Sequence, residues 1–487
     1  MLNLEPKKVF DYFEEISQIP RGSGNEKAIS DYLVKFAKDR GLEVVQDATD
    51  SILITKPAAA GMEKAPGVIV QGHMDMVCVK TPDSTHDFLK DPLTLEVDGD
   101  LLTAKNTTLG ADNGIAVAMT LALLDSDDIP HPHLEVVITT NEEVNMNGAL
   151  HFDAALLKGK YFINVDSEEE GEITIGCAGG LKAVLELPYT KEDLAPGLRQ
   201  KEIIVAGLKG GHSGAEIHTN RGNSHKLMGR FLSALKKEID FEVLEIGGGI
   251  KDNVIPSHTV CRIALAPEQE AVLTEVQNRM QKEWTNELSA SDPKVELLVK
   301  NCRTEDVQKI NDEAAKKLIL LLNTLPNGVQ TMSSKLPGMV ESSLNLAVIQ
   351  MTEQVISLSF STRSNVGSLK QQLNSVLQDF ADMNGLHFYK TAEYPEWEMK
   401  PESELLKKAA ATYQSLTGKE AVVKAIHAGL ECGVFLSKKP ELEAISIGPD
   451  MWDVHSVKER LSISSTQRTW EYLKTLLAEL GKLSYKW

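Results

Sequence analysis

The stretch GVIVQGHMDM, residues Gly67–Met76, places a histidine and an aspartate directly after a short run of apolar residues. Such a run, bounded by glycine, is typical of a strand that is buried on both faces of a sheet. His73 and Asp75 then lie at the carboxyl end of the strand, where open α/β sheets place their binding sites. The stretch therefore predicts a strand of an α/β domain with functional side chains at its end.

Three further apolar runs end near a residue type that commonly binds metal. These residues are Glu143 after the run 134–139, Asp166 after the run 161–165, and His455 after the run 444–447. A fifth candidate, Asp112, precedes an apolar helix predicted at 115–124, where a carboxylate can also cap the helix. Because parallel strands end at the same edge of a sheet, we expect these side chains to converge on one crevice.

The order of predicted elements indicates two domains. Strands and helices alternate through 1–185 and again through 399–487, which predicts an α/β domain with a mostly parallel sheet covered on both faces. Residues 186–398 instead follow the order strand, helix, strand, strand, helix, strand, which is typical of ferredoxin-like α+β domains. A similar partial order follows and opens with a helix predicted at 305–322, so the insert is expected to contain one or two such halves.

Composition excludes several classes of protein. The 51 Lys and Arg residues against 70 Asp and Glu give a net charge of −19, which disfavours binding to nucleic acid and to anionic membranes. The beginning lacks the pattern of a signal peptide, and no apolar run is long enough for a membrane span. The five cysteines form no CxxC pair, which favours free thiols and a cytoplasmic location.

The five converging residues suit two Zn²⁺-like ions. Imidazole and carboxylate both bind borderline cations, and one aspartate can bridge two ions with its two oxygens. We assign His73, Asp112 and Asp166 to one ion. We assign Asp112, Glu143 and His455 to the other. Mn²⁺ and Co²⁺ fit the same ligands, so the sequence leaves the native metal open.

Two neighbouring acids have no ligand role in this scheme. Asp75 lies on the same strand face as His73 and can accept the second N–H of its imidazole. Glu142 is adjacent to Glu143, and a base there can take the proton of metal-bound water and pass it to a leaving amine. Each motif alone is also compatible with a purely structural role. Their convergence on strand ends favours metal-assisted hydrolysis of an amide bond.

Five motifs resemble, in order and spacing, those of the co-catalytic metallopeptidases, a family that includes aminoacylase, carnosinase, succinyl-diaminopimelate desuccinylase and peptidase T. The motifs are QGHMDMV, TLGADNGIAVA, TTNEEVNMNGA, FINVDSEEEGEITIG and DVHSVKE. The resemblance covers nearly the whole chain and implies the same ligands, orienting acid and base. It also implies that the insert is a lid. Because this insert is longer than a single family lid, both a homodimer and a monomer stay open.

The resemblance further implies roles for residues of the lid and of a late turn. The segment GLKGGHSGAEIH is similar to the family's lid segment, whose histidine, here His218, stabilises the developing oxyanion from its own or a partner subunit. Asn253 and Arg363 resemble lid contacts to substrate, and a guanidinium suits a terminal carboxylate because it can pair with both oxygens. Glu431, in HAGLECG, is expected to meet the substrate's free amino group.

These observations leave a ranked set of functions. The first is hydrolysis of unblocked dipeptides, including dipeptides that end in histidine, with two Zn²⁺ ions per subunit and a small peptide as the only partner besides a second copy. An aminotripeptidase or an N-acyl amino acid deacylase would use the same site. A non-catalytic metal-dependent binding protein is an alternative of another class.

Overall fold

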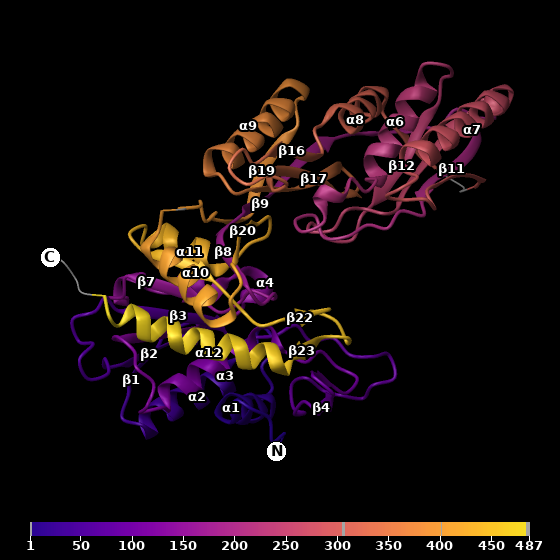
Figure 1. Ribbon diagram of the computed structural model, residues 1–487. Coiled ribbons are helices and arrows are strands. Elements are labelled where there is room, and N and C mark those ends of the chain that lie inside the picture. Colours follow the sequence, from indigo (N-terminus) through magenta and orange to yellow (C-terminus); the bar gives the residue numbers. More distant parts are fainter. Residues whose placement is uncertain (1, 304–306, 401, 484–487) are drawn as a thin grey trace. The chain divides into compact units, whose positions relative to one another are not determined.

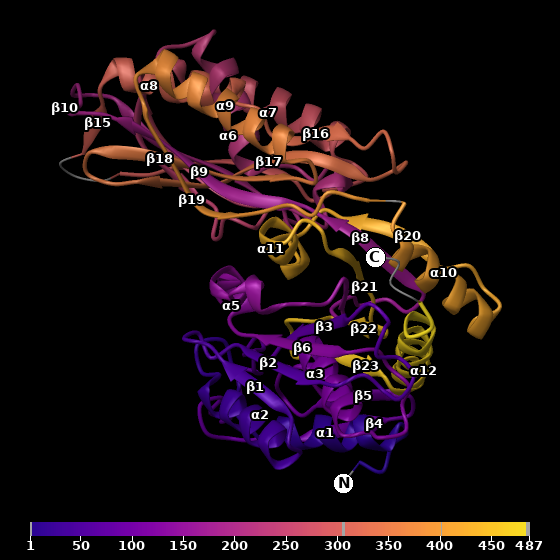
Figure 2. The same ribbon diagram turned by 90° about the vertical axis from the view of Figure 1, so that its left-hand side faces the viewer.

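The computed structural model describes residues 2–303, 307–400 and 402–483, which form two compact units (Figures 1 and 2). The first unit comprises Met1–Cys177, Trp397–Ala425 and Leu430–Trp487. The second comprises Ala178–Glu396 and Ile426–Gly429. The division thus falls after 177 and after 396, whereas the sequence indicated 186–398 for the insert. The strand that begins at Gly179 already pairs within the sheet of the second unit.

An eight-stranded sheet lies at the centre of the first unit. In spatial order its strands are β1 (Glu43–Gln46), β2 (Ile52–Lys56), β6 (Leu134–Thr139), β3 (Val68–His73), β7 (Tyr161–Asn164), β21 (Glu443–Ser446), β8 (Glu172–Cys177) and β20 (Val422–Ile426). The four strands from β6 to β21 run parallel, and every residue of β3, β6 and β7 is buried. β1, β2 and β8 pair antiparallel. The sheet is therefore mixed, and its parallel part carries the predicted site.

Helices of the first unit pack against this sheet and against one another. They are α1 (Lys7–Ser17), α2 (Lys27–Asp39), α3 (Ala111–Leu124), α4 (Glu142–Asn145), α5 (Asn147–His151), α10 (Glu404–Thr417), α11 (Glu431–Lys438) and α12 (Ile463–Leu480). α3 is apolar around most of its circumference and packs against β3 and α1, as expected of a fully buried helix. It therefore fixes the position of the metal-type residue in its first turn.

A smaller four-stranded sheet joins two distant parts of the first unit. Its strands, in spatial order, are β22 (Met451–Trp452), β23 (Arg460–Ser462), β5 (Leu101–Ala104) and β4 (Leu95–Asp98). β23 pairs with β5 through Leu461 and Leu102. This pairing brings the segment that carries His455 beside the segment that leads to Asp112.

The second unit is built on a nine-stranded antiparallel sheet. In spatial order its strands are β14 (Glu296–Asn301), β11 (Arg199–Ala206), β13 (Thr259–Leu265), β12 (Glu242–Gly248), β17 (Val340–Met351), β18 (Val355–Ser364), β9 (Gly179–Pro188) and β19 (His387–Tyr394), with β16 (Gly328–Met332) paired to β17. The helices α6 (Ser224–Lys236), α7 (Glu270–Glu287), α8 (Asp312–Thr324) and α9 (Gly367–Asn384) lie on one face (Figures 1 and 2). One apolar core, which includes Phe231, Trp284 and Phe360, fills the space between them.

Both predicted ferredoxin-like halves are present in this unit. The first half has the order β11-α6-β12-β13-α7-β14, and the second has the order β9-α8-β17-β18-α9-β19. The first half is inserted between β9 and α8 of the second. The halves join where Gly248 of β12 pairs with Ile349 of β17. The insert is thus one continuous sheet made of two similar halves.

The helix predicted at 305–322 begins later in the structure. Residues 304–306 lie outside the described residues, and β15 (Gln308–Ile310) then pairs with β10 (Lys191–Asp193). α8 starts only at Asp312, where two acidic residues occupy its first turn and favour a helix N-terminus. Because β15 pairs with the distant β10, these residues form a strand although their sequence pattern favours a helix.

None of the helices in the described part of the chain combines the length and the apolar character needed to span a bilayer. The described residues contain no disulfide, and Cys177, Cys261 and Cys432 are buried.

Candidate metal centre

His73 lies at the end of β3 and is almost fully buried. Its Nε2 is 3.2 Å from Oδ1 of Asp112 and 3.5 Å from Oδ1 of Asp166. Asp112 stands in the first turn of α3, and Asp166 follows β7. The carboxyl ends of two parallel strands and one helix start therefore meet at a single point, as the sequence predicted.

The other oxygen of Asp112 faces a second histidine. Nε2 of His455 is 3.0 Å from Oδ2 of Asp112 and 2.9 Å from Oε2 of Glu143. The two oxygens of Asp112 thus face different imidazoles, as a carboxylate that would bridge two cations requires. Two imidazoles and three carboxylates also form a donor set that fits two borderline divalent ions. The structure brings all five predicted ligands together.

Negative charge is concentrated at this cluster. Burial raises the pKa of Glu143 to about 7, and the nearby Asp112 adds to the shift. Burial opposes protonation of His455, but hydrogen bonds to Asp112 and Glu143 outweigh it and raise its pKa to about 11. Carboxylates that raise the proton affinity of their neighbours in this way also favour a bound cation.

Asp75 contacts the imidazole of His73 from the opposite side. Its Oδ1 lies 3.3 Å from Nδ1 of His73 and accepts a hydrogen bond from the amide of Glu142 at 3.0 Å. Oδ2 accepts from the amide of Glu143 at 3.3 Å and from the hydroxyl of Ser23 at 2.7 Å. Asp75 therefore fixes both the ring of His73 and the turn that carries the acidic pair. These contacts fit the orienting role predicted for it.

Glu142 lies beside the cluster without belonging to the predicted ligands. Its Oε2 is 3.9 Å from Nε2 of His73. Burial raises its pKa well above the ordinary value, with Asp166 and Glu431 adding to the shift and His73 opposing it. A carboxylate with a raised pKa can both accept a proton and return it, which is what a general base that later acts as an acid requires.

The predicted lid residues all lie in the second unit. His218, on the short helix η2 (Ile217–Thr219), and Asn253 are exposed. Arg363, near the end of β18, is buried, and its Nη1 donates to the hydroxyl of Tyr394 at 2.8 Å. Its Nε has no partner among the described residues. No carboxylate within the described ranges forms an ion pair with this buried guanidinium, so it is well suited to an external anion.

His427 lies close to Arg363 in the same unit. Its Nε2 is 2.7 Å from the hydroxyl of Ser343, and its Nδ1 is 3.1 Å from Oδ1 of Asn365. Burial, with the charge of Arg363 added, lowers the pKa of His427 to about 3, so the ring is neutral at physiological pH. A Cβ at Gly214 would lie 3.2 Å from Nε of Arg363. The lid segment GLKGGHSGAEIH thus passes directly over the guanidinium.

Glu431 begins α11 and is completely buried in the first unit. Its Oε2 accepts hydrogen bonds from Nε2 of Gln71 at 2.5 Å and from the hydroxyl of Thr139 at 2.6 Å. Its Oε1 has no partner in the part of the chain that the structure describes. Burial raises its pKa to about 8. Its predicted contact with a substrate amine stays a prediction.

Sequence reasoning missed three residues that hold the segment carrying Asp112, namely Arg21, Asn113 and Glu459. Asn113 accepts from the amide of His73 at 3.2 Å and donates to the carbonyl of Val165 at 2.6 Å. Asn113 and Glu459 fall inside the motifs TLGADNGIAVA and DVHSVKE, so their positions were visible but their roles were not. Arg21 lies outside these motifs, and no sequence pattern indicated that it holds this segment.

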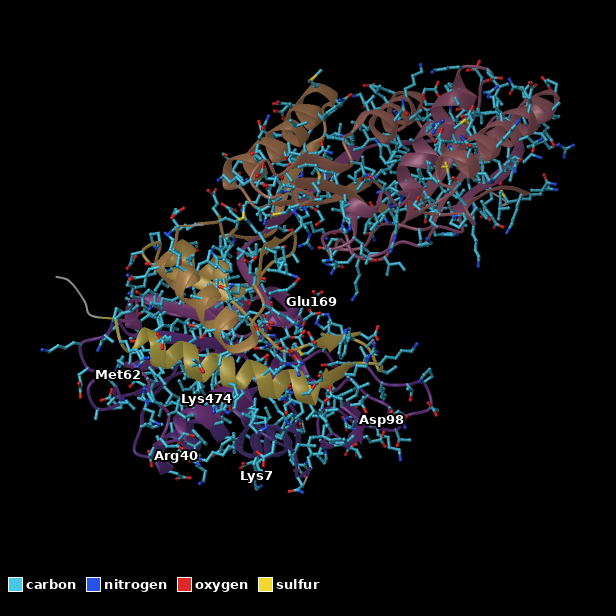
Figure 3. All side chains as sticks on the ribbon, viewed as in Figure 1. Lys7, Arg40, Met62, Asp98, Glu169 and Lys474 are labelled. Atoms are coloured by element: carbon cyan, nitrogen blue, oxygen red, sulfur yellow. The ribbon has the colours of Figure 1, made fainter. Side chains whose placement is uncertain are left out.

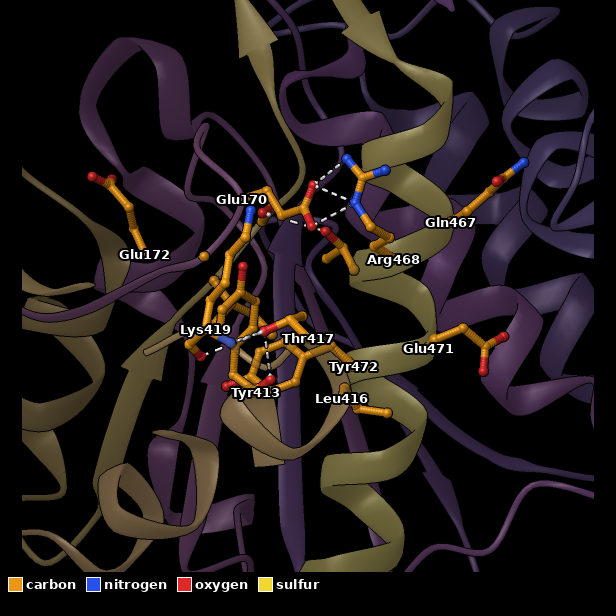
Figure 4. Close-up of a pocket in the computed structure, with 14 residues that line it drawn as sticks. Glu170, Glu172, Tyr413, Leu416, Thr417, Lys419, Gln467, Arg468, Glu471 and Tyr472 are labelled. Atoms are coloured by element: carbon orange, nitrogen blue, oxygen red, sulfur yellow. Dashed lines mark hydrogen bonds and ion pairs between the residues drawn. The ribbon is translucent and has the colours of Figure 1, made fainter. Parts of the chain in front are cut away.

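A cavity of about 380 Å³ opens elsewhere in the first unit, beside α10 and α12 (Figure 4). Its walls include Tyr413, Tyr472 and the ion pair in which Nη2 of Arg468 lies 2.6 Å from Oε2 of Glu170. The adjacent Glu169, labelled in Figure 3, is exposed in the loop that follows the strand β7. None of the predicted site residues lines this cavity. It is therefore separate from the metal-type cluster.

A parallel sheet that gathers two histidines and three carboxylates at one edge defines the class of metal-dependent hydrolases. Comparison with known proteins narrows this class. The chain is 38% identical to the cytosol non-specific dipeptidase of Escherichia coli (strain K12), over 98% of both chains. Residues 204–292 match the peptidase dimerisation domain of the M20 family. The chain belongs to the M20 family of metallopeptidases.

Solved structures agree with this assignment. The aminoacylhistidine dipeptidase of Vibrio alginolyticus superimposes with a TM-score of 0.88 and 37% sequence identity, covering 98% of this chain and 97% of that one. The aminopeptidase PepT of Bacillus cereus gives a TM-score of 0.57 at 15% identity, covers 98% of this chain and all of that one, and shares the fold. The family resemblance and the predicted fold class are thereby confirmed.

Proposed function

We propose that this chain is a metal-dependent dipeptidase that hydrolyses unblocked dipeptides, including those that end in histidine. The observation that carries the proposal is Asp112, whose two oxygens face His73 and His455 separately. Relatives that match nearly the whole chain are named as a cytosol non-specific dipeptidase and an aminoacylhistidine dipeptidase, which supports the substrate class.

Two Zn²⁺ ions per subunit are the proposed cofactors. His73, Asp112 and Asp166 would hold one ion. Asp112, Glu143 and His455 would hold the other. When bound, the ions would polarise the scissile carbonyl and would lower the pKa of a water molecule at the site. Mn²⁺ or Co²⁺ would suit the same nitrogen and oxygen donors.

The chain's own residues supply the proton transfers and the orientation. Glu142 takes a proton from the attacking water on its carboxylate and gives it to the leaving nitrogen. Asp75 keeps the imidazole of His73 in place through Nδ1. His218 donates a hydrogen bond to the oxyanion that develops on the substrate carbonyl. Through these steps a dipeptide is hydrolysed to two amino acids without a covalent enzyme intermediate.

Three side chains, those of Arg363, Asn253 and Glu431, are assigned to substrate recognition. Arg363 pairs with the terminal carboxylate of the dipeptide, for which its unpartnered Nε is available, and Asn253 contacts the substrate backbone. Glu431 meets the free amino group through Oε1. A homodimer is proposed from the matched dimerisation domain, and a cytoplasmic location from the name of the relative in Escherichia coli.

Arg363→Lys is expected to raise KM about 10- to 100-fold with little change in kcat, because an ammonium lacks the planar pair of N–H donors that matches a carboxylate, and a charged hydrogen bond contributes about 1.5–3 kcal/mol. Steady-state kinetics on a free dipeptide would measure both constants. Arg262→Lys is the matched control, because Arg262 is partly exposed and pairs with Glu202 and Glu245 in the same unit. An unchanged KM in Arg363→Lys would show that the carboxylate is bound elsewhere.

The proposed function is tested by a short substrate panel with the metal-reconstituted protein. The panel holds a free Xaa-His dipeptide, its N-acetylated form and a tripeptide, each with and without chelator. Chelator-sensitive cleavage of only the free dipeptide is expected, and Glu431→Gln should weaken the preference over the acetylated form. Preferred cleavage of the acetylated compound or of the tripeptide would instead indicate a deacylase or a tripeptidase. No cleavage by a protein with two bound metals would favour a binding protein.

A further inference from the structure

We propose that Glu459 is a positioning residue that aims the two oxygens of Asp112 at two separate cations. The proposal rests on the metal-binding role of Asp112 given above. It concerns a residue that contacts neither the histidines nor the substrate directly, and that acts through the backbone of the segment 109–112.

Glu459 uses both carboxylate oxygens to bind four consecutive backbone amides. Oε2 accepts from Leu109 at 2.8 Å and from Gly110 at 3.0 Å. Oε1 accepts from Ala111 at 2.8 Å and from Asp112 at 3.3 Å. The residue is only 3% exposed, so water does not compete for these bonds. A single buried carboxylate therefore binds every backbone amide from Leu109 to Asp112.

Arg21 holds the same turn from another side. This residue is 1% exposed, and its Nη2 donates to the carbonyl of Gly110 at 2.6 Å while Nη1 donates to the carbonyl of Met74 at 3.0 Å. Gly110 has a φ of +66°, and a Cβ there would lie 2.6 Å from Nη2 of Arg21. Arg21 thus links this turn to the end of β3, and Glu459 links it to the C-terminal part of the chain.

Glu459 is also close in the sequence to His455, one of the proposed metal ligands. It stands four residues after His455, whose Nε2 touches Oδ2 of Asp112 at 3.0 Å. One segment therefore contacts Asp112 twice, through an imidazole at the carboxylate and through a carboxylate at the backbone. A bridging aspartate must present both oxygens at once, so a displaced backbone cannot be corrected by side-chain rotation without losing one contact.

A purely structural role for Glu459 leads to a different result. If its hydrogen bonds only stabilised the turn, their loss would lower the free energy of unfolding and leave metal affinity unchanged. If they position Asp112, metal affinity falls in a protein that still folds. Metal binding measured apart from turnover separates the two.

The test is Glu459→Gln, which keeps the size of the side chain but presents an NH₂ group to two of the four amides. Isothermal titration of the metal-free protein with Zn²⁺ is expected to show binding weakened about 10- to 100-fold at one site or both, the loss typical of groups that orient metal ligands. Unfolding of the metal-free variant should stay cooperative. We further expect kcat to fall more than KM rises. Glu459→Asp, whose carboxylate cannot reach all four amides, should be intermediate.

Glu441→Gln is the matched control, because Glu441 is exposed in the same unit and forms only a long ion pair with Lys439, at 3.8 Å, among the described residues. Two Zn²⁺ ions bound by Glu459→Gln with native affinity would overturn the proposal. If that variant does not fold, native affinity in Glu459→Asp has the same meaning. A native protein that binds two ions but cleaves no peptide would refute the proposed function and leave this test intact.

Discussion

Glu142→Gln is expected to lower kcat about 10²- to 10⁴-fold, the contribution usual for a positioned general base. The amide has nearly the same shape as the carboxylate but cannot take a proton from water. KM and metal content should change little, because Glu142 is outside the set of ligands and its Oε2 lies 3.9 Å from the imidazole of His73. Steady-state kinetics on a free dipeptide, with metal analysis of the same sample, would measure all three quantities.

Glu169→Gln is the appropriate control for this experiment. Glu169 is exposed, and its substitution removes the same charge near the same end of the sheet. Full turnover by Glu142→Gln, with substrate and metal bound normally, would mean that another group carries the proton.

Asp112→Asn is expected to abolish most of the activity and to remove at least one metal ion. An asparagine offers one neutral oxygen where the carboxylate offers two charged ones, so it cannot face His73 and His455 together. The loss should exceed the roughly 10- to 100-fold effect of substituting a group behind the ligands. Metal analysis after dialysis, beside activity at increasing Zn²⁺, would measure it.

Asp31→Asn serves as the control. Asp31 is exposed on α2, and its carboxylate contacts the side chains of Lys27 and Gln46 at the surface. An Asp112→Asn protein that retains two ions and substantial turnover would contradict the bridging role.

The parallel part of the fold could be predicted because its signal is local. Strands buried on both faces leave unbroken apolar runs, and the next residues along the chain are the ones at the sheet edge. His73, Asp166 and Glu143 could therefore be placed together from sequence alone. Asp112 was harder, because its position before a helix also fits a simple cap.

Contacts between distant polar residues left no such signal. Glu431 binds Gln71 and Thr139 across separations of 360 and 292 residues, and no periodicity marks any of the three. The hydrogen bonds of His427 to Ser343 and Asn365 could not be predicted either, because a serine in β17 and an asparagine just after β18 resemble surface residues. The short pairing of β10 with β15 also joins distant segments, so it could not be predicted. Because of it, α8 begins later than the helical pattern indicated.

The interleaving of the two halves of the second unit has a consequence for how the chain acquires its structure. All strands of the first half lie within 199–301, so this half can pair its strands soon after they leave the ribosome. β9 precedes it but pairs with β18 and β19, which are made far later. Such distant pairing slows folding, and an unpaired strand edge invites association with other chains. We therefore expect β9 to be the segment that most needs protection during synthesis.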